Sequence, residues 1–229
     1  MAKVQRESSK SLKESLIRVY EQLLDAYGYQ GWWPIDREYH LKRGTNPEEE
    51  IIIGAVLTQN TSWKNVERAL ENLKVHGEIS LEYIRREKDE RLKELIKPSG
   101  FYNQKAKRLK LVAQFFNPIE VLKTVKRDEL LNLKGIGGET ADVILLYAGD
   151  RLTFVIDRYT QRFFERFYNL KRSYEALKAF FEENLPKDLK VYKEFHALMD
   201  QHAKVFCRNT PLCGGCPIRN QCISASPSS

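Results

Sequence analysis

Residues 133–141 read Leu-Lys-Gly-Ile-Gly-Gly-Glu-Thr-Ala, and apolar residues recur at helical spacing on both sides of them. The three glycines, Gly135, Gly137 and Gly138, fall within four positions. Glycine adopts positive φ angles and lets another backbone come close, so this stretch predicts a tight turn between two helices. We expect Ile136 to pack between the two helices of this hairpin.

The glycine turn also has the chemistry of a phosphate site. Its backbone N–H groups and the start of the next helix can bind a phosphate oxygen without reading base sequence. We count Lys134, the three glycines and Ile136 as candidate phosphate-binding residues. The plainer interpretation is an ordinary turn between two helices, and the glycines alone do not choose between the two.

Helical periodicity dominates the rest of the chain. Apolar residues recur at three- and four-residue steps, and Gly, Pro, Asn or Asp mark nearly every linker. The clearest apolar faces lie within residues 12–24, 51–73, 92–112, 143–167 and 176–181. Only residues 153–156 read as extended. We therefore expect an all-α chain with about ten or more helices.

The composition limits the classes of protein. The 229 residues are 42% hydrophobic, which is enough for a substantial core in one large domain or two lobes. Lys and Arg outnumber Asp and Glu by 38 to 31, which favours a polyanionic partner but is a weak signal by itself. The chain has no run of about eighteen apolar residues, and residues 1–14 lack the apolar segment of a signal peptide. We expect no membrane partner and a cytoplasmic location.

Asp157 ends an apolar run and comes twenty residues after Gly137. An aspartate at such a place is often only the N-cap of the next helix. The spacing also allows the chain to return this carboxylate to the glycine turn. A carboxylate there could activate water or stabilise an oxocarbenium-like sugar, as in glycoside hydrolysis generally. Asp157 is therefore a candidate catalytic residue.

All four cysteines lie near one end of the chain, in the order Cys207-x5-Cys213-x2-Cys216-x5-Cys222. Crowding in one region indicates a shared metal centre rather than a disulfide framework. Zinc commonly takes two CxxC pairs, and this loop has one. The wider intervals suit an iron–sulfur cluster, although spacing alone does not decide the metal, and unrelated free thiols are the remaining alternative.

The glycine turn, Asp157 and the cysteine loop, in this order, resemble the endonuclease III superfamily of helix-hairpin-helix DNA glycosylases. The resemblance covers most of the chain and includes Leu57-Thr58-Gln59-Asn60 on an early helix. It implies that Asp157 is the catalytic aspartate and that Gln59 fills the gap left by a flipped nucleotide. It also implies a [4Fe–4S] cluster in preference to zinc, although the first cysteine interval is one residue shorter than the usual family pattern. A surface helix position is the plainer interpretation of Gln59.

Glu139 departs from the bifunctional members of that superfamily. They carry a lysine at this position of the hairpin, which attacks the sugar as a Schiff-base nucleophile. A glutamate cannot form that imine, and Lys134 lies on the other side of the turn. The resemblance therefore implies direct hydrolysis by water, with Glu139 lining the pocket or orienting the water. The plainer interpretation of Glu139 is a favourable acidic residue in the first turn of a helix.

Four stretches also resemble 3-methyladenine DNA glycosylase III, namely residues 32–34, 54–61, 98–106 and 135–142. That subgroup also has Glu at the position of Glu139, and pairs an aromatic pocket with alkylated purines. A methylated purine is cationic, and indole faces attract cations. The residues that the resemblance places in a base pocket are Trp32, Trp33, Trp63 and Lys204, with core packing as the alternative for the tryptophans. The cysteine loop is a departure, because some members of this subgroup lack it.

These features together predict a two-lobed, all-α helix-hairpin-helix glycosylase fold with a C-terminal iron–sulfur loop. Residues 46–150 are expected to form a central domain, and residues 1–45 with 151–229 a second lobe held by the cysteine cluster at 207–222. We expect double-stranded DNA with a damaged base to lie across the cleft between the lobes of a monomer. The predicted function is a monofunctional DNA N-glycosylase of base excision repair that releases alkylated purines such as 3-methyladenine.

Three alternatives remain open at this stage. The first is a glycosylase that also cleaves the strand and acts on oxidised pyrimidines, as the wider superfamily suggests. The second is a mismatch glycosylase that removes adenine or thymine. The third is a DNA-binding module without catalysis, which keeps the hairpin only for phosphate contacts. Asp157 argues against the third.

Overall fold

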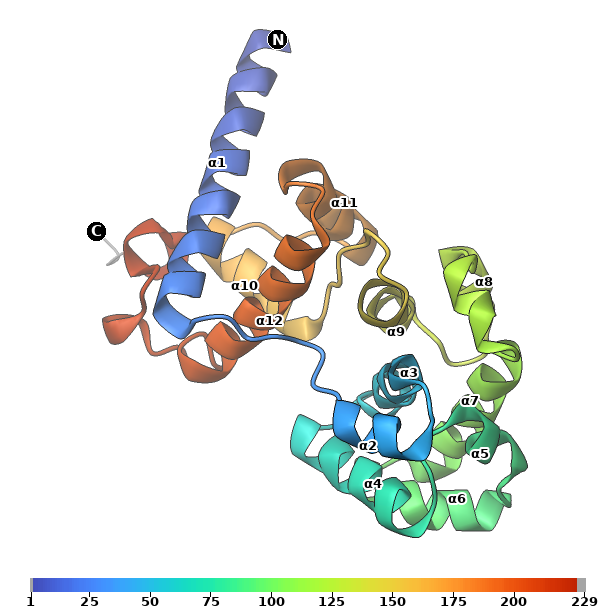
Figure 1. Cartoon of the computed structure of the whole chain (residues 1–229). Helices are drawn as coiled ribbons and strands as arrows, with labels where there is room; N and C mark the ends of the chain where they lie inside the picture. Colours follow the sequence, from blue (N-terminus) through green and yellow to red (C-terminus); the bar gives the residue numbers. More distant parts are fainter. Residues whose placement is uncertain (1, 226–229) are drawn as a thin grey trace. The chain divides into compact units, whose positions relative to one another are not determined.

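The computed structural model describes the backbone of residues 2–225 and the side chains of residues 13–225. Within residues 2–225 there are helices of the α, 3-10 and π types and no β-strand, so the expected all-α class is confirmed (Figure 1). Residues 153–156, which were expected to be extended, have no regular secondary structure. No helix in this part of the chain is long and apolar enough to cross a membrane.

The chain divides into two compact units. Unit 1 comprises Met1–Trp32 and Leu152–Ser229, and unit 2 is the continuous stretch Trp33–Arg151. Residue 1 and residues 226–229 of the expected second lobe lie outside the described part of the chain. Of the two expected catalytic residues, Glu139 belongs to unit 2 and Asp157 to unit 1.

Unit 2 is built around α3 (Pro47–Leu57). All of residues 50–57 are buried, because a helix that is apolar on nearly every side is covered on every side. Asn46 caps the start of α3 by accepting a hydrogen bond from the Glu48 N–H at 3.2 Å. The helices that pack against α3 are α4 (Trp63–His76), α7 (Tyr102–Phe115), α9 (Gly138–Val143) and η3 (Ile144–Ala148). The other helices of the unit are α2 (Arg37–Arg43), α5 (Leu81–Arg86), α6 (Asp89–Ile96), η1 (Lys97–Ser99), η2 (Ile119–Lys123) and α8 (Arg127–Leu131).

Helices α8 and α9 form a hairpin around the glycine turn. Gly135 has a φ of +87°, a left-handed conformation that glycine adopts readily. The helix that begins at Gly138 does not stay α-helical, because the Gly149 N–H bonds to the carbonyl of Ile144, five residues back, at 3.0 Å. The result is the π-helix η3 in place of the regular helix expected from the apolar spacing. Such widened turns often occur at functional sites.

Unit 1 packs four longer helices around an aromatic core: α1 (Ala2–Tyr27), α10 (Arg158–Tyr168), α11 (Tyr174–Asn184) and α12 (Leu189–Val205). The fully buried Leu16, Val19 and Leu23 lie on α1, which packs against α11 and α12 (Figure 1). Phe154 stacks on Phe181 with ring centroids 4.5 Å apart. The described chain then ends in a loop with three short 3-10 helices, η4 (Cys213–Gly215), η5 (Arg219–Gln221) and η6 (Ile223–Ala225), and this loop carries the cysteines.

Candidate functional site

The glycine turn of unit 2 has exposed backbone and charged side chains close to one another in sequence. Lys134 and Gly135 are exposed, whereas Ile136 is 5% exposed and anchors the turn. The first N–H groups of a helix have no partner within it, so the start of α9 points its donors into this turn. Glu139 lies in the first turn of α9 and is exposed. The arrangement can bind an anion at the turn, with a carboxylate, not an amine, at the first exposed side-chain position of α9.

Gln59 is tied directly to this turn. Its side-chain Nε2 donates to the carbonyl of Gly135 at 3.0 Å and lies 2.9 Å from the Thr140 hydroxyl. The guanidinium of Arg108 donates to Gln59 Oε1 at 2.6 Å and also packs against Gly135, where an added Cβ would clash with Arg108 Nε. The structure therefore joins the end of α3, the glycine turn and α7 through one amide side chain.

Gln59 lies in a turn and not on the helix, which differs from the sequence-based expectation. Helix α3 ends at Leu57 because its carbonyl accepts a hydrogen bond from the ammonium of Lys105 at 2.7 Å. Lys105 is fully buried and also donates to the carbonyl of Ser99 at 2.6 Å. Burial lowers the pKa of Lys105 to about 8, and the charge of Arg108 adds to this effect.

Trp33 and Trp63 meet inside unit 2. Their ring centroids are 5.4 Å apart at 85°, and Tyr147 of the π-helix lies 5.3 Å from Trp33. Gly54 of α3 leaves room for the indole, since a Cβ there would lie 3.4 Å from Trp33 Nε1. These three aromatic side chains form the aromatic cluster of unit 2. Such a cluster can hold a planar, electron-poor ring.

Asp157 is the N-cap residue of α10, which is the plainer of the two interpretations that the sequence left open. It caps α10, since its Oδ1 accepts a hydrogen bond from the Thr160 N–H at 2.6 Å. Its other oxygen, Oδ2, lies 3.7 Å from Nε2 of His196, and the side chain stays 13% exposed. Burial raises the pKa of Asp157, but the interaction with the nearby His196 ring and the bonds to Thr160 outweigh it and lower the pKa below 3.8. The group is therefore an ionised carboxylate at neutral pH.

One face of α12 carries three polar residues next to Asp157, at the regular spacing His196, Asp200 and Lys204. Lys204 forms an ion pair with Asp200, and its ammonium lies 5.7 Å from the ring centre of Trp32. The Trp32 ring also meets His196 edge to face at 5.6 Å. The structure thus brings Trp32, Lys204 and Asp157 of the predicted site into one group through His196.

Sequence reasoning missed His196 and Asp200. The signal was present, because residues 196, 200 and 204 are four apart and share one helical face. A polar stripe of this kind usually faces solvent, yet His196 is 3% and Asp200 5% exposed. The hairpin and Asp157 lie in different units, so the expected approach of Asp157 to the glycine turn stays a prediction.

The four cysteines line a single cavity of about 160 Å³ in unit 1. None is in a disulfide, and the aromatic rings of Phe163, Phe167 and Phe206 form much of the remaining wall. Burial raises the pKa of the Cys216 thiol, and the charges of the other three cysteines add to the rise. Within the described chain no three His, Cys, Asp or Glu side chains are arranged to hold a metal ion.

Two nitrogen-bearing side chains, of His202 and Arg166, lie beside these cysteine sulfurs. Nε2 of His202 lies 3.7 Å from the sulfur of Cys216, and the hydroxyl of Tyr27 lies 2.9 Å from its Nδ1. Burial lowers the pKa of His202 to about 4, so the ring is neutral at pH 7. The guanidinium of Arg166 lies 3.5 Å from the sulfur of Cys207. Donors in these places stabilise negative sulfur ligands.

Comparison with known protein families gives a match over residues 53–187, which is more than half of the chain. The matched family is described as HhH-GPD superfamily base excision DNA repair protein.

Individual proteins are similar over most of their length. MJ1434 of Methanocaldococcus jannaschii, named provisionally as a DNA repair glycosylase, is 49% identical over 223 residues, or 92% of this chain and 97% of that protein. Endonuclease III of Thermotoga maritima is 30% identical over 179 residues, or 75% of this chain and 81% of the relative. Among solved structures, a 3-methyladenine DNA glycosylase of H. pylori bound to 1,N6-ethenoadenine is 29% identical with a TM-score of 0.67, over 86% of this chain and 97% of that one.

Proposed function

Since the chain belongs to the HhH-GPD superfamily of base excision DNA repair glycosylases, we propose that it is a monofunctional DNA N-glycosylase that releases alkylated purines such as 3-methyladenine. Membership agrees with the resemblance to the endonuclease III superfamily and confirms it. The observation that carries the finer proposal is Glu139, an exposed carboxylate in the first turn of α9, where strand cleavage through an imine requires an amine.

The chemistry follows from the groups around Asp157. Water adds its oxygen to C1′ of the deoxyribose, the bond from C1′ to the base nitrogen breaks, and the electron pair leaves with the base. Positive charge develops on the sugar, and the Asp157 carboxylate is ionised at neutral pH and stabilises it. The water proton passes to a nearby carboxylate or to solvent. A methylated purine is cationic and leaves as a neutral base, so it needs little help from an acid.

The tryptophans support a cationic substrate. The ammonium of Lys204 already lies over the Trp32 ring, so this indole face attracts a positive charge. The aromatic cluster of unit 2 offers edges and faces for a planar base. The H. pylori glycosylase at 29% identity was solved with an ethenoadenine, which is an alkylated purine. We therefore assign Trp32, Trp33, Trp63 and Lys204 to the base pocket.

The DNA-binding residues of the proposal are Gln59, Lys134, Gly135, Ile136, Gly137 and Gly138. The glycine turn binds a phosphate through backbone N–H groups. Gln59 fills the gap left in the duplex when the damaged nucleotide is flipped out. Its hydrogen bonds to the turn couple these two tasks.

We also propose that Cys207, Cys213, Cys216 and Cys222 hold a [4Fe–4S] cluster. They line one cavity, and Arg166 and His202 supply hydrogen bonds for sulfur ligands. The preference for a cluster over zinc rests on the single CxxC pair and the wider cysteine intervals, together with the resemblance to the endonuclease III superfamily. The bound cluster would cross-link Cys207, which follows the end of α12, to the three cysteines of the C-terminal loop. Iron and sulfide analysis with a visible absorption spectrum tests this assignment against zinc.

A panel of lesion-containing duplexes tests the substrate. We expect 3-methyladenine to be released from methylated duplex DNA, and we expect no borohydride-trapped complex on a duplex with an abasic site. Good activity on an oxidised pyrimidine with trapping would replace the proposal with a glycosylase that also cleaves the strand, the activity class suggested by the similarity to endonuclease III. Release from a mismatched duplex alone would identify a mismatch glycosylase.

A further inference from the structure

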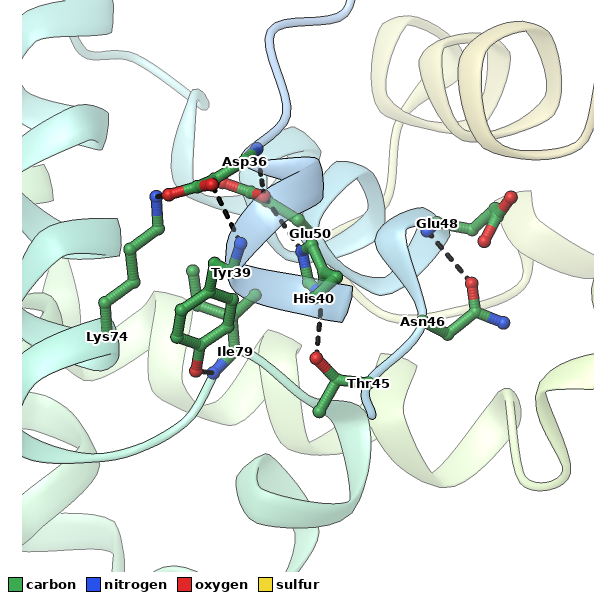
Figure 2. Close-up of polar contacts among 9 residues, drawn as sticks. All are labelled: Asp36, Tyr39, His40, Thr45, Asn46, Glu48, Glu50, Lys74 and Ile79. Carbon is green, nitrogen blue, oxygen red and sulfur yellow. Dashed lines mark hydrogen bonds and ion pairs between the residues drawn. The ribbon is translucent and has the colours of Figure 1, made fainter. Parts of the chain in front are cut away.

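Glu50 lies on α3 outside the groups described so far. Its side chain is buried, and Oε2 accepts hydrogen bonds from the backbone N–H of Asp36 at 3.0 Å and from Nε2 of His40 at 2.9 Å (Figure 2). The other ring nitrogen of His40 lies 2.8 Å from the hydroxyl of Thr45. This buried network joins the segment around α2 to the central helix of unit 2.

Asp36 is held from three directions. Its backbone N–H bonds to Glu50, its Oδ1 accepts from the Tyr39 N–H at 3.0 Å, and its Oδ2 pairs with the Lys74 ammonium at 2.9 Å (Figure 2). The hydrogen bond from Lys74 lowers the pKa of Asp36 and keeps it ionised. The position of residue 36 is therefore fixed by contacts with α2, α3 and α4.

The same segment leads directly to Trp33. Three residues span at most about 10 Å, so an anchor at Asp36 restrains where Trp33 can lie. Pro34 restrains it further, because proline fixes its own φ and limits the residue before it. The Trp33 indole lies on Gly54, and Gly54 follows Glu50 by one turn on the same face of α3.

We propose that Glu50 is a positioning residue of the base pocket: it fastens the segment before α2 to α3 and so holds the Trp33 indole on Gly54, edge to face with Trp63. The inference rests on the proposed function in placing Trp33 in the pocket. A buried carboxylate is costly to desolvate, and an apolar replacement of the pair is often as stable. The Glu50 carboxylate fixes the position of the segment before α2 through its hydrogen bonds, which an apolar side chain could not do.

The first test follows the tryptophans themselves. The chain has three tryptophans, so 5-fluorotryptophan labelling gives three ¹⁹F resonances that single Trp→Phe variants assign. The matched control is Glu49→Gln, since Glu49 is the preceding residue and its Oε2 accepts from the Leu81 N–H at 2.7 Å, facing α5 instead. We expect Glu50→Gln to shift or broaden the Trp33 resonance and leave Trp32 in place, and Glu49→Gln to move neither. A Trp33 resonance that stays in place in Glu50→Gln overturns the inference.

The second test measures the consequence in single-turnover release from methylated duplex DNA. We expect Glu50→Gln to slow release between about ten- and a hundredfold, because a misplaced pocket group loses rate of this order. In the Trp33→Phe background the same change should add little. His40→Gln, which removes the other partner, should reproduce both results if Glu50→Gln does not fold. Wild-type protein that releases no methylated purine, with a Trp33 resonance that still responds to Glu50→Gln, refutes the substrate and leaves the positioning role intact.

Discussion

Units 1 and 2 each contain a carboxylate beside a histidine, and the two pairs differ in distance and in exposure. In unit 2, Glu50 lies 2.9 Å from His40 and both side chains are at most 4% exposed. In unit 1, Asp157 lies 3.7 Å from His196 and keeps 13% of its side chain exposed. Each carboxylate also accepts a hydrogen bond from a backbone N–H. A carboxylate paired with a histidine is therefore a buried structural contact in unit 2, and a partly exposed, ionised group in unit 1.

The largest effect is expected at the accessible pair. Asp157→Asn should slow base release roughly a thousandfold, because the charge that stabilises the sugar is lost. Asparagine caps helices as well as aspartate does, so stability should hardly change. Asp188→Asn is the matched control, since Asp188 caps α12 in the same unit and accepts from the Val191 N–H at 3.0 Å. Single-turnover assays on methylated duplex measure both, and equal rates in the two variants would remove Asp157 from the reaction.

Disrupting the buried Glu50–His40 pair should destabilise the fold. Glu50→Ala should lower the free energy of unfolding by about 3 kcal/mol, because it leaves His40 and a backbone N–H buried without their acceptor. Glu82→Ala is the control, since Glu82 is 56% exposed and pairs with Arg86 on the same helix. This substitution should lower the free energy of unfolding by less than about 1 kcal/mol. Urea unfolding followed by circular dichroism gives both values. Equal losses would mean that burial does not distinguish the two glutamates.

A third buried charge, Lys105, is held by backbone carbonyls in place of a carboxylate. Its pKa is lowered to about 8 in the fold, from 10.5 in the unfolded chain. Between these values the unfolded chain binds more protons, so stability should rise with pH by about 2 kcal/mol from about pH 8 to 9.5. Lys105→Met should flatten that rise, which urea titrations at a series of pH values will measure. A rise of the same size in the variant would assign it to another group.

The smallest effect is expected for His196→Gln. His196 helps to lower the pKa of Asp157, so its loss should raise that pKa and move the acid limb of the pH–rate profile to higher pH. On the plateau above the acid limb the rate should change little, because there Asp157 is ionised in both proteins. An acid limb that does not move would show that His196 has no influence on the carboxylate.

The sequence sufficed for the parts of the molecule that depend on local pattern. Glycine spacing predicted the turn at 135–138, and helical periodicity predicted an all-α fold, because both follow from backbone geometry within a few residues. The end of α3 at Leu57 was not predictable, since it depends on Lys105, 48 residues further along. Likewise, nothing local distinguishes Glu50 from Glu48 and Glu49 in an acidic first turn. The three glutamates differ only in the contacts that they make after the chain has folded.

Unit 2 is one continuous stretch of chain, whereas unit 1 is completed only by residues from both sides of it. During synthesis α1 therefore leaves the ribosome long before its partner α12, which begins 162 residues after α1 ends at Tyr27 (189 − 27). At about 5 to 20 residues per second this delay is roughly 8 to 32 s, ample time for unit 2 to fold first. Throughout that interval Leu16, Val19 and Leu23 have no α12 to pack against, so this apolar face of α1 is a surface for nascent-chain chaperones to cover.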